Sequence, residues 1–245
     1  MIKENDFIEI DFVGRVKGGD VFDSTKKEDL EKLHSGHNHP IKSKPLIFCV
    51  GKGMFLESLD KFLLGKEVGK KYEVDLTPEK AFGKRDISKI QRIPSKVFME
   101  QKVNPVPGAV FNFDGRVGKI LTSSGGRVVV DFNHSLAGKD VSYKINVLRK
   151  VTDMDEKVSA VNDFFLKKEF KFKVDEKGKK LIIEADDSMG RLIELFKDKY
   201  KDILGLDVEV KNPDKEKSKP KNDEDKNSKE LEKSNKKEPA KENQK

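Results

Sequence analysis

Two alternating stretches, Phe7–Val16 and Val141–Val151, lie far apart in the chain and constrain its fold most strongly. Alternation with a period of two predicts strands that bury one face and leave the other face in water. A third stretch of this kind is Lys71–Leu76, and Phe55–Leu64 carries apolar residues at helical spacing before Gly65. These pieces predict an α+β fold in which a small antiparallel sheet wraps on one short helix.

The segment Ile87–Asn133 has a different residue pattern from the rest of the chain, and this pattern predicts a small inserted all-β domain. Asp114-Gly115 and Ser124-Gly125-Gly126 separate short alternating runs and are signals for hairpin turns. The main sheet would therefore be formed by residues 1–86 and 134–151, on either side of the insert.

Residues 152–211 predict a further part with the order αββαβ. About sixty residues bury too little surface to be very stable alone, so we expect this part to pack on the rest of the chain or to form a two-fold homodimer. Residues 212–245 contain eleven lysines, nine acidic residues and only two apolar residues. Such a segment cannot form a core, and we expect a disordered charged tail.

Composition excludes several classes of protein. Basic residues (51) exceed acidic residues (44) only slightly, and the tail has no aromatic side chain for base stacking, so we expect no nucleic-acid partner. The apolar runs fall far short of the ~20 residues that a membrane span requires. The N-terminus lacks the apolar core of a signal peptide, which predicts a cytoplasmic protein. The single cysteine, Cys49, excludes an internal disulfide and is expected to be buried.

Several ordered motifs carry a resemblance to a known family. Val21–Ser24, Val50–Lys70 and Thr77–Asp86 resemble segments of the FKBP-type peptidyl-prolyl cis-trans isomerases, particularly the SlyD-like branch, in which a domain is inserted in the flap. Gln91–Phe98 and Val128–Lys139 look like the two ends of that insert. The resemblance covers about residues 1–151 and implies an isomerase that forms no covalent intermediate and uses no cofactor.

The resemblance implies an apolar site for an X–Pro bond with one acidic side chain beside it. At the catalytic positions it places Asp23, Phe12, Phe82 and Tyr143. The expected substrate-binding residues are Phe22, Leu46, Phe55, Leu56 and Leu59. The chain departs from the family's pattern where Phe12 and Phe82 replace tyrosine and Leu59 replaces a large aromatic residue.

The insert is expected to bind unfolded chains, as it does in the SlyD-like family. Flexible methionine and phenylalanine side chains suit promiscuous binding, and we expect Phe98 and Met99 to be exposed. The predicted chaperone surface comprises Val97, Phe98, Met99 and Phe111. The alternative function is a non-catalytic holdase or assembly module that uses the same pocket and insert.

Two histidine features have a weaker interpretation. His34, His37 and His39 form a cluster that could bind a transition metal, but a solvated loop without metal is the preferred interpretation. His134 lacks a serine or aspartate relay, so we expect it to stabilise a loop.

Overall fold

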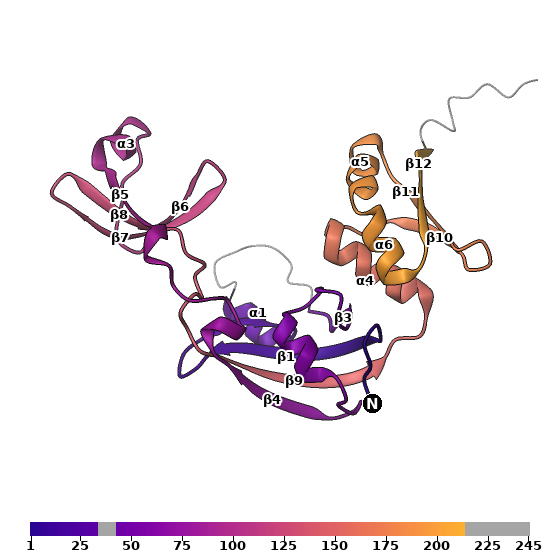
Figure 1. Cartoon of the computed structure of the whole chain (residues 1–245). Helices are drawn as coiled ribbons and strands as arrows, with labels where there is room; N and C mark the ends of the chain where they lie inside the picture. The colour runs from indigo at the N-terminus through magenta and orange to yellow at the C-terminus, as the bar shows by residue number, and fades with distance from the viewer. Residues whose placement is uncertain (34–42, 214–245) are drawn as a thin grey trace, which may run out of the picture. The chain divides into compact units, whose positions relative to one another are not determined.

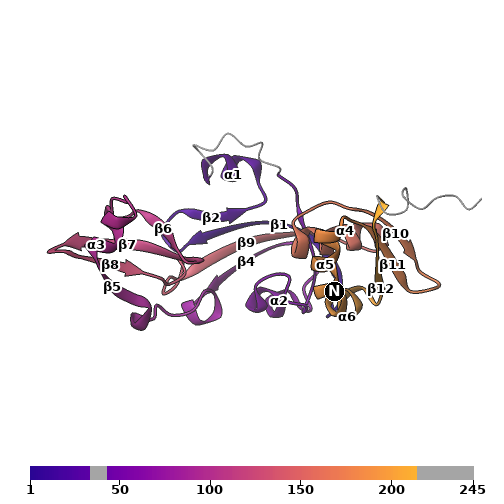
Figure 2. The same cartoon turned by 90° about the horizontal axis from the view of Figure 1, so that it is seen from above.

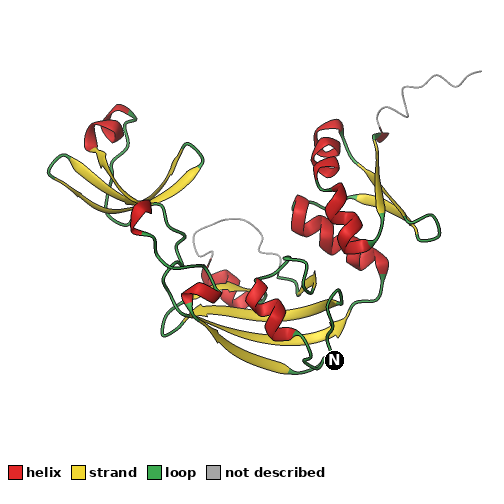
Figure 3. Cartoon of the chain, viewed as in Figure 1, coloured by secondary structure: helices red, strands yellow, loops and turns green. Residues whose placement is uncertain are grey.

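The computed structural model describes residues 1–33 and 43–213, which fold as two compact units. The first unit is Met1–Glu169, and the second begins at Phe170. Figure 1 follows the chain through both units, and Figure 3 separates their helices from their strands. In the part of the chain that is described, no helix is long and apolar enough to cross a membrane. The tail beyond residue 213, predicted to be disordered, lies outside the described residues.

The first unit is built on a five-stranded antiparallel sheet, seen from above in Figure 2. Four strands follow the order β2-β1-β9-β4, and β3 pairs with the remaining length of β1. The central pair, β1 and β9, joins residues more than a hundred positions apart, as the alternation predicted. The strands are β1 (Phe7–Val16), β2 (Val21–Ser24), β3 (Leu46–Cys49), β4 (Lys71–Leu76) and β9 (Val141–Lys150).

One short helix, α2 (Glu57–Leu63), packs on this sheet and confirms the predicted α+β class. Leu59 and Leu63 are fully buried, and the Phe62 ring meets the Tyr72 ring of β4 at 6.4 Å. The helix ends before Gly65, which adopts φ +75°, a conformation that glycine reaches without steric cost. A second helix, α1 (Lys27–Leu33), lies in a segment that was not predicted to be helical.

Helix α4 (Met154–Leu166) belongs to the first unit, although the sequence analysis grouped it with the C-terminal part. The Asp153 side chain caps it by accepting the Glu156 N–H at 2.9 Å. The Lys157 ammonium lies 5.6 Å from the centre of the Phe7 ring on β1. Phe7 is buried (5% exposed), whereas Glu9 and Asp11, which follow it at alternate positions of β1, are half-buried.

The insert forms its own four-stranded sheet in the order β5-β8-β7-β6. A short helix, α3, follows β5, so the prediction of an all-β insert is corrected to a sheet with one helix. The buried core consists of Phe98, Ile120, Val128 and Val130. The elements are β5 (Ile90–Pro94), α3 (Ser95–Glu100), β6 (Val110–Phe113), β7 (Arg116–Ser124) and β8 (Arg127–Asp131), and two 3-10 turns precede them at Pro78–Lys80 and Ile87–Lys89.

The second unit has a three-stranded sheet, β10-β11-β12, and two helices. The single helix expected between β11 and β12 is interrupted at Phe196, which ends α5 and begins α6. β12 pairs parallel to β11, as a helical crossover between strands allows. The elements are β10 (Lys171–Asp175), β11 (Lys180–Glu184), α5 (Asp187–Leu195), α6 (Lys197–Leu204) and β12 (Asp207–Lys211).

Candidate active site

Five aromatic rings from separate parts of the first unit meet in one cluster. Phe55 lies 5.2 Å from Phe12 and 6.1 Å from Tyr143, measured between ring centroids. Phe22 lies 5.7 Å from Tyr143 and 5.6 Å from Phe82, and both contacts are edge to face. Edge-to-face packing at these distances is favourable. The structure therefore brings together five of the predicted site residues, which we call the aromatic cluster.

Gly14 allows two rings of the cluster to approach the strand that supports them. A Cβ atom at this position would lie 2.9 Å from Cζ of Phe22 and 3.0 Å from Cε1 of Tyr143. The β1–β2 register shifts between Gly14 and Arg15. The sequence analysis missed Gly14, although a glycine inside a strand is a known signal for close approach.

Asp23 lies beside Tyr143 at the edge of the cluster. Partial burial raises the pKa of the Asp23 carboxyl, and a hydrogen bond from the Ser24 backbone lowers it in part. Tyr143 is buried (3% exposed), and burial together with the charge of Asp23 raises the pKa of its phenol. The phenol therefore stays protonated and can donate a hydrogen bond.

The three predicted leucines have different surroundings. Leu59 is fully buried on α2, and Leu56 is half-buried at the N-terminus of that helix. In the part of the chain that is described, the Leu56 N–H has no acceptor. Leu46 is half-buried and lines a separate groove of about 600 Å³ between β3 and α4, together with Ile47 and Phe164.

Of the two residues that were expected to be exposed in the insert, Met99 is exposed and Phe98 is not. Phe98 is 3% exposed and forms the core of the insert, so it is not the surface residue that was expected. Phe111 is half-buried against the same core. The exposed large apolar side chains of the insert are Ile87 (82% exposed), Val97 (38%), Met99 (67%), Val106 (51%), Val110 (58%) and Val117 (61%).

Polar contacts join the two chain crossings between the insert and the main sheet. The Arg85 guanidinium donates to one Asp131 oxygen at 2.6 and 3.0 Å. The Asn133 amide accepts the Asp86 N–H at 2.9 Å and donates to the Asp86 carbonyl and to Asp131 at 2.8 and 2.7 Å. We call this set of four residues the neck.

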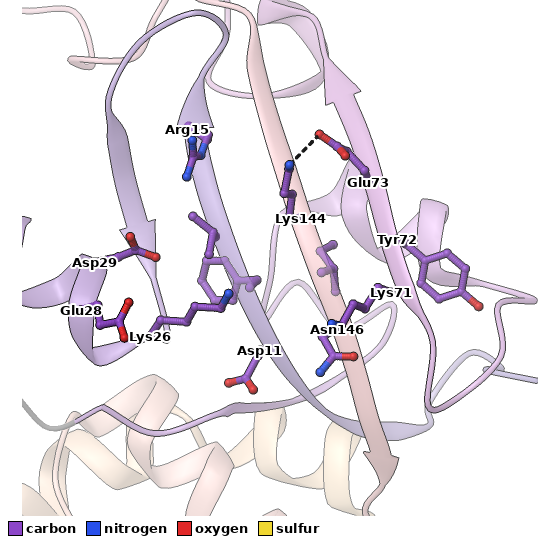
Figure 4. A pocket seen from close by; sticks show the side chains of 13 residues that line it. Asp11, Arg15, Lys26, Glu28, Asp29, Lys71, Tyr72, Glu73, Lys144 and Asn146 are labelled. Carbon is purple, nitrogen blue, oxygen red and sulfur yellow. Dashed lines mark ion pairs between the residues drawn. The ribbon is translucent and has the colours of Figure 1, made fainter.

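A second groove, of about 720 Å³, lies on the opposite face of the main sheet (Figure 4). Its side chains come from alternate strand positions such as Asp11, Arg15 and Lys144, which point away from the aromatic cluster. Positive and negative groups are present together, and Lys144 pairs with Glu73 at 3.6 Å. Phe12, Val13 and Ile145 also line this groove, but most of its lining residues are charged or polar, unlike the apolar walls that an X–Pro bond requires.

No described feature indicates a metal or nucleophile site. Residues 1–33 and 43–213 contain no group of three histidine, cysteine or acidic side chains that could hold a metal. The histidine cluster at His34, His37 and His39 lies outside these residues. Cys49 forms no disulfide and is fully buried, as predicted.

Prolyl isomerases have this arrangement: an aromatic site with one carboxyl group, on an antiparallel sheet that wraps a short helix. In this chain a β-rich insert separates strands β4 and β9 of that sheet in the sequence. Residues 1–103 match the family profile described as FKBP-type peptidyl-prolyl cis-trans isomerase. Residues 91–136 match the profile described as FKBP26, IF domain.

Curated relatives agree with this match. The chain is 33% identical over 147 residues to the short-type peptidyl-prolyl cis-trans isomerase of Methanocaldococcus jannaschii, covering 60% of this chain and 92% of the relative. It is 36% identical over 128 residues to the FKBP-type 16 kDa isomerase of Escherichia coli, covering 50% and 83%. Identity to the SlyD isomerase of Haemophilus influenzae is 31% over 119 residues, covering 43% and 57%. The chain therefore belongs to the FKBP-type peptidyl-prolyl cis-trans isomerases.

Proposed function

We propose that this isomerase rotates X–Pro bonds in unfolded polypeptides and that its insert holds those polypeptides as a folding chaperone. The observation that carries the proposal is the aromatic cluster with Asp23 at its edge. Phe12, Phe82 and Tyr143 form the walls nearest the reacting bond.

The site favours the twisted form of the bond. Resonance holds the imide planar behind a barrier of ~18–20 kcal/mol, and rotation removes the charge separation of the planar form. Apolar rings that exclude water stabilise the less polar twisted state more than the planar state, which is the requirement for catalysis. This mechanism requires neither a nucleophile nor a cofactor.

Two polar groups complete the proposed site. Asp23 is the carboxyl group beside the imide carbonyl; its side chain remains exposed to solvent, and partial desolvation raises its pKa. The neutral phenol of Tyr143 offers an O–H donor to the same carbonyl. The charge of Asp23 in turn helps to keep the phenol neutral.

The peptide on either side of the proline needs further contacts. The Leu56 N–H is free to donate to a backbone carbonyl, because the described residues supply no acceptor for it. Phe22 and Phe55 would contact the proline ring, and the buried Leu59 would form the floor beneath it. Leu46 would contact residues that flank the proline, in the groove beside α4.

The insert supplies a second binding surface in this proposal. Six large apolar side chains that are 38 to 82% exposed are available to a long unfolded chain. β5 and β6 are the edges of the insert sheet, and an extended chain can pair with such an edge. A chain held there has a raised effective concentration of prolines at the aromatic cluster.

Replacing Ile87–Asn133 with a short turn tests this division of labour. Turnover of a short X–Pro peptide should stay within a few-fold, since the aromatic cluster lies outside the insert. Acceleration of proline-limited protein refolding and suppression of aggregation should fall at least about ten-fold, because the tether is lost. The double variant Met99→Ser/Val117→Ser should reproduce the second effect with less change in structure.

The variants Asp23→Leu and Leu56→Ala supply the opposite control. They should reduce peptide turnover and leave aggregation suppression largely intact. Refolding that is not accelerated by substoichiometric wild-type protein, with aggregation still suppressed, would establish the non-catalytic holdase instead. Loss of peptide turnover on deletion of the insert, with refolding unaffected, would contradict the division of labour.

We also propose a homodimer through the C-terminal part of the chain. Leu195 on α5 is 79% exposed, and its neighbours Leu192 and Phe196 are half-buried. Ile203 on α6 is buried within the unit. A self-complementary patch around Leu195 would remove this apolar surface from water.

A further inference from the structure

The Phe82 ring is held between two other rings. The edge of Phe22 meets it at 5.6 Å with an interplanar angle of 88°. On another side, the His134 imidazole stacks on it at 4.9 Å with an angle of only 6°. His134 follows the last strand of the insert, β8, by three positions, so the segment that returns from the insert adds a ring to the aromatic cluster.

The hydrogen bonds of His134 determine which ring nitrogen carries the proton. The Leu136 N–H donates to Nδ1 of His134 at 3.3 Å. A nitrogen that accepts a hydrogen bond carries no proton, so the neutral imidazole carries its proton on Nε2. His134 is exposed, and within residues 1–33 and 43–213 nothing accepts a hydrogen bond from Nε2. The result is an N–H donor at the rim of an otherwise apolar wall.

A bound peptide needs such a donor at this wall. Backbone carbonyls next to the proline lose water when they enter an apolar site, and an unsatisfied carbonyl costs about 1–3 kcal/mol. Phe12, Phe22, Phe55 and Phe82 have no N–H or O–H group in their side chains. The stacked imidazole supplies the missing group beside Phe82.

We propose that His134 Nε2–H donates a hydrogen bond to a backbone carbonyl of the peptide that flanks the isomerised proline, which makes His134 a substrate-binding residue. This inference rests on the proposed isomerase function and assigns one more group to the same site. In this proposal the neck positions His134, because Asn133, the residue before it, is held by hydrogen bonds with Asp86 and Asp131.

The variant His134→Phe keeps an aromatic ring on Phe82 and removes the donor. For a short X–Pro peptide, kcat/KM should fall about 3- to 10-fold, the usual range for one hydrogen bond. The bond exists in the bound peptide before and during rotation, so KM should rise while kcat changes little. The urea midpoint of unfolding should stay near the wild-type value, because the packing is retained.

A second substitution tests whether the donor itself is responsible. Phe82→Tyr places a hydroxyl at the same rim, so the double variant His134→Phe/Phe82→Tyr should recover KM to within about two-fold of Phe82→Tyr alone. An unchanged KM in His134→Phe, with active wild-type protein, would overturn the hydrogen bond and leave the isomerase proposal standing. A fall in kcat alone, or a defect that Phe82→Tyr does not repair, would also overturn it. Wild-type protein without peptide turnover would overturn the isomerase proposal and this inference together.

Discussion

Adding a single methyl group to Gly14 should damage the active site more than the stability of the fold. The new Cβ in Gly14→Ala would lie 2.9 and 3.0 Å from two Phe22 ring atoms and 3.0 Å from one Tyr143 atom. Carbon atoms pack best at about 3.5–4.0 Å, so the rings must move by roughly 0.5–1 Å. Phe22 is half-buried and can move outward, whereas Tyr143 is buried.

Two opposing contributions set the effect on stability. Overpacking costs about 1–3 kcal/mol, and replacing a strand glycine returns about 0.5–1 kcal/mol of backbone entropy. The free energy of unfolding should therefore fall by only about 1 kcal/mol, measured by urea denaturation. A displacement approaching 1 Å at reacting groups can cost up to about 100-fold in rate, and we expect kcat/KM for a short X–Pro peptide to fall about ten-fold.

Gly118→Ala in the insert is a matched control for this experiment. Its Cβ would lie 2.6 Å from a Val130 methyl carbon and 2.9 Å from the Phe132 ring. This variant should lose at least as much stability as Gly14→Ala and keep the peptide turnover of the wild type. Wild-type turnover in Gly14→Ala, or an equal loss of turnover in both variants, would contradict the idea that the close approach of Phe22 and Tyr143 to Gly14 positions these rings for catalysis.

Two further predictions concern other parts of the chain. Asp60 is 3% exposed and its Oδ2 accepts the Gly51 N–H at 3.1 Å. Burial raises its pKa, so the unfolded chain releases this proton first, and the contribution of this carboxyl to stability is lost as pH rises above about 4. Asp60→Asn keeps an oxygen that can accept the Gly51 N–H and removes the buried charge. The unfolding free energy of the variant minus that of the wild type should therefore increase between about pH 3 and pH 7. A difference that does not change with pH would contradict this explanation. For the proposed homodimer, light scattering should give about twice the 27.9 kDa chain mass for the wild type and for Met99→Glu, and a monomeric mass for Leu195→Glu. A monomeric wild type at concentrations on the order of tens of micromolar would remove the dimer.

Local sequence patterns predicted the strands well because each pattern reports on a single element. The alternation in Phe7–Val16 and Val141–Val151 needs only one buried face, and both strands lie where it placed them. Phe98 was misassigned for the opposite reason. A short helix of six residues gives too few turns to show which side chain faces the core.

The candidate site was predictable only in part. The positions of Phe12, Phe22, Phe55, Phe82 and Tyr143 came from a resemblance, and the contacts among their rings came from the structure. His134 carried no motif that links it to Phe82, because the stack depends on how the return from the insert is held at the neck. The packing of α4 on β3 and the contact of Lys157 with Phe7 of β1 are likewise tertiary features that no local sequence pattern reports.

The central position of β9 has a consequence for the order of events during protein synthesis. β9 lies between β1 and β4 in the sheet, yet it is the last of the three to leave the ribosome. At about 5–20 residues per second, β1 waits on the order of ten seconds for its principal partner. The insert, whose strands are consecutive in the chain, can pair during that interval. The nascent chain would thus have a folded insert before it has a complete active site, and the closure of the main sheet would be the slow step because its contacts are distant in sequence.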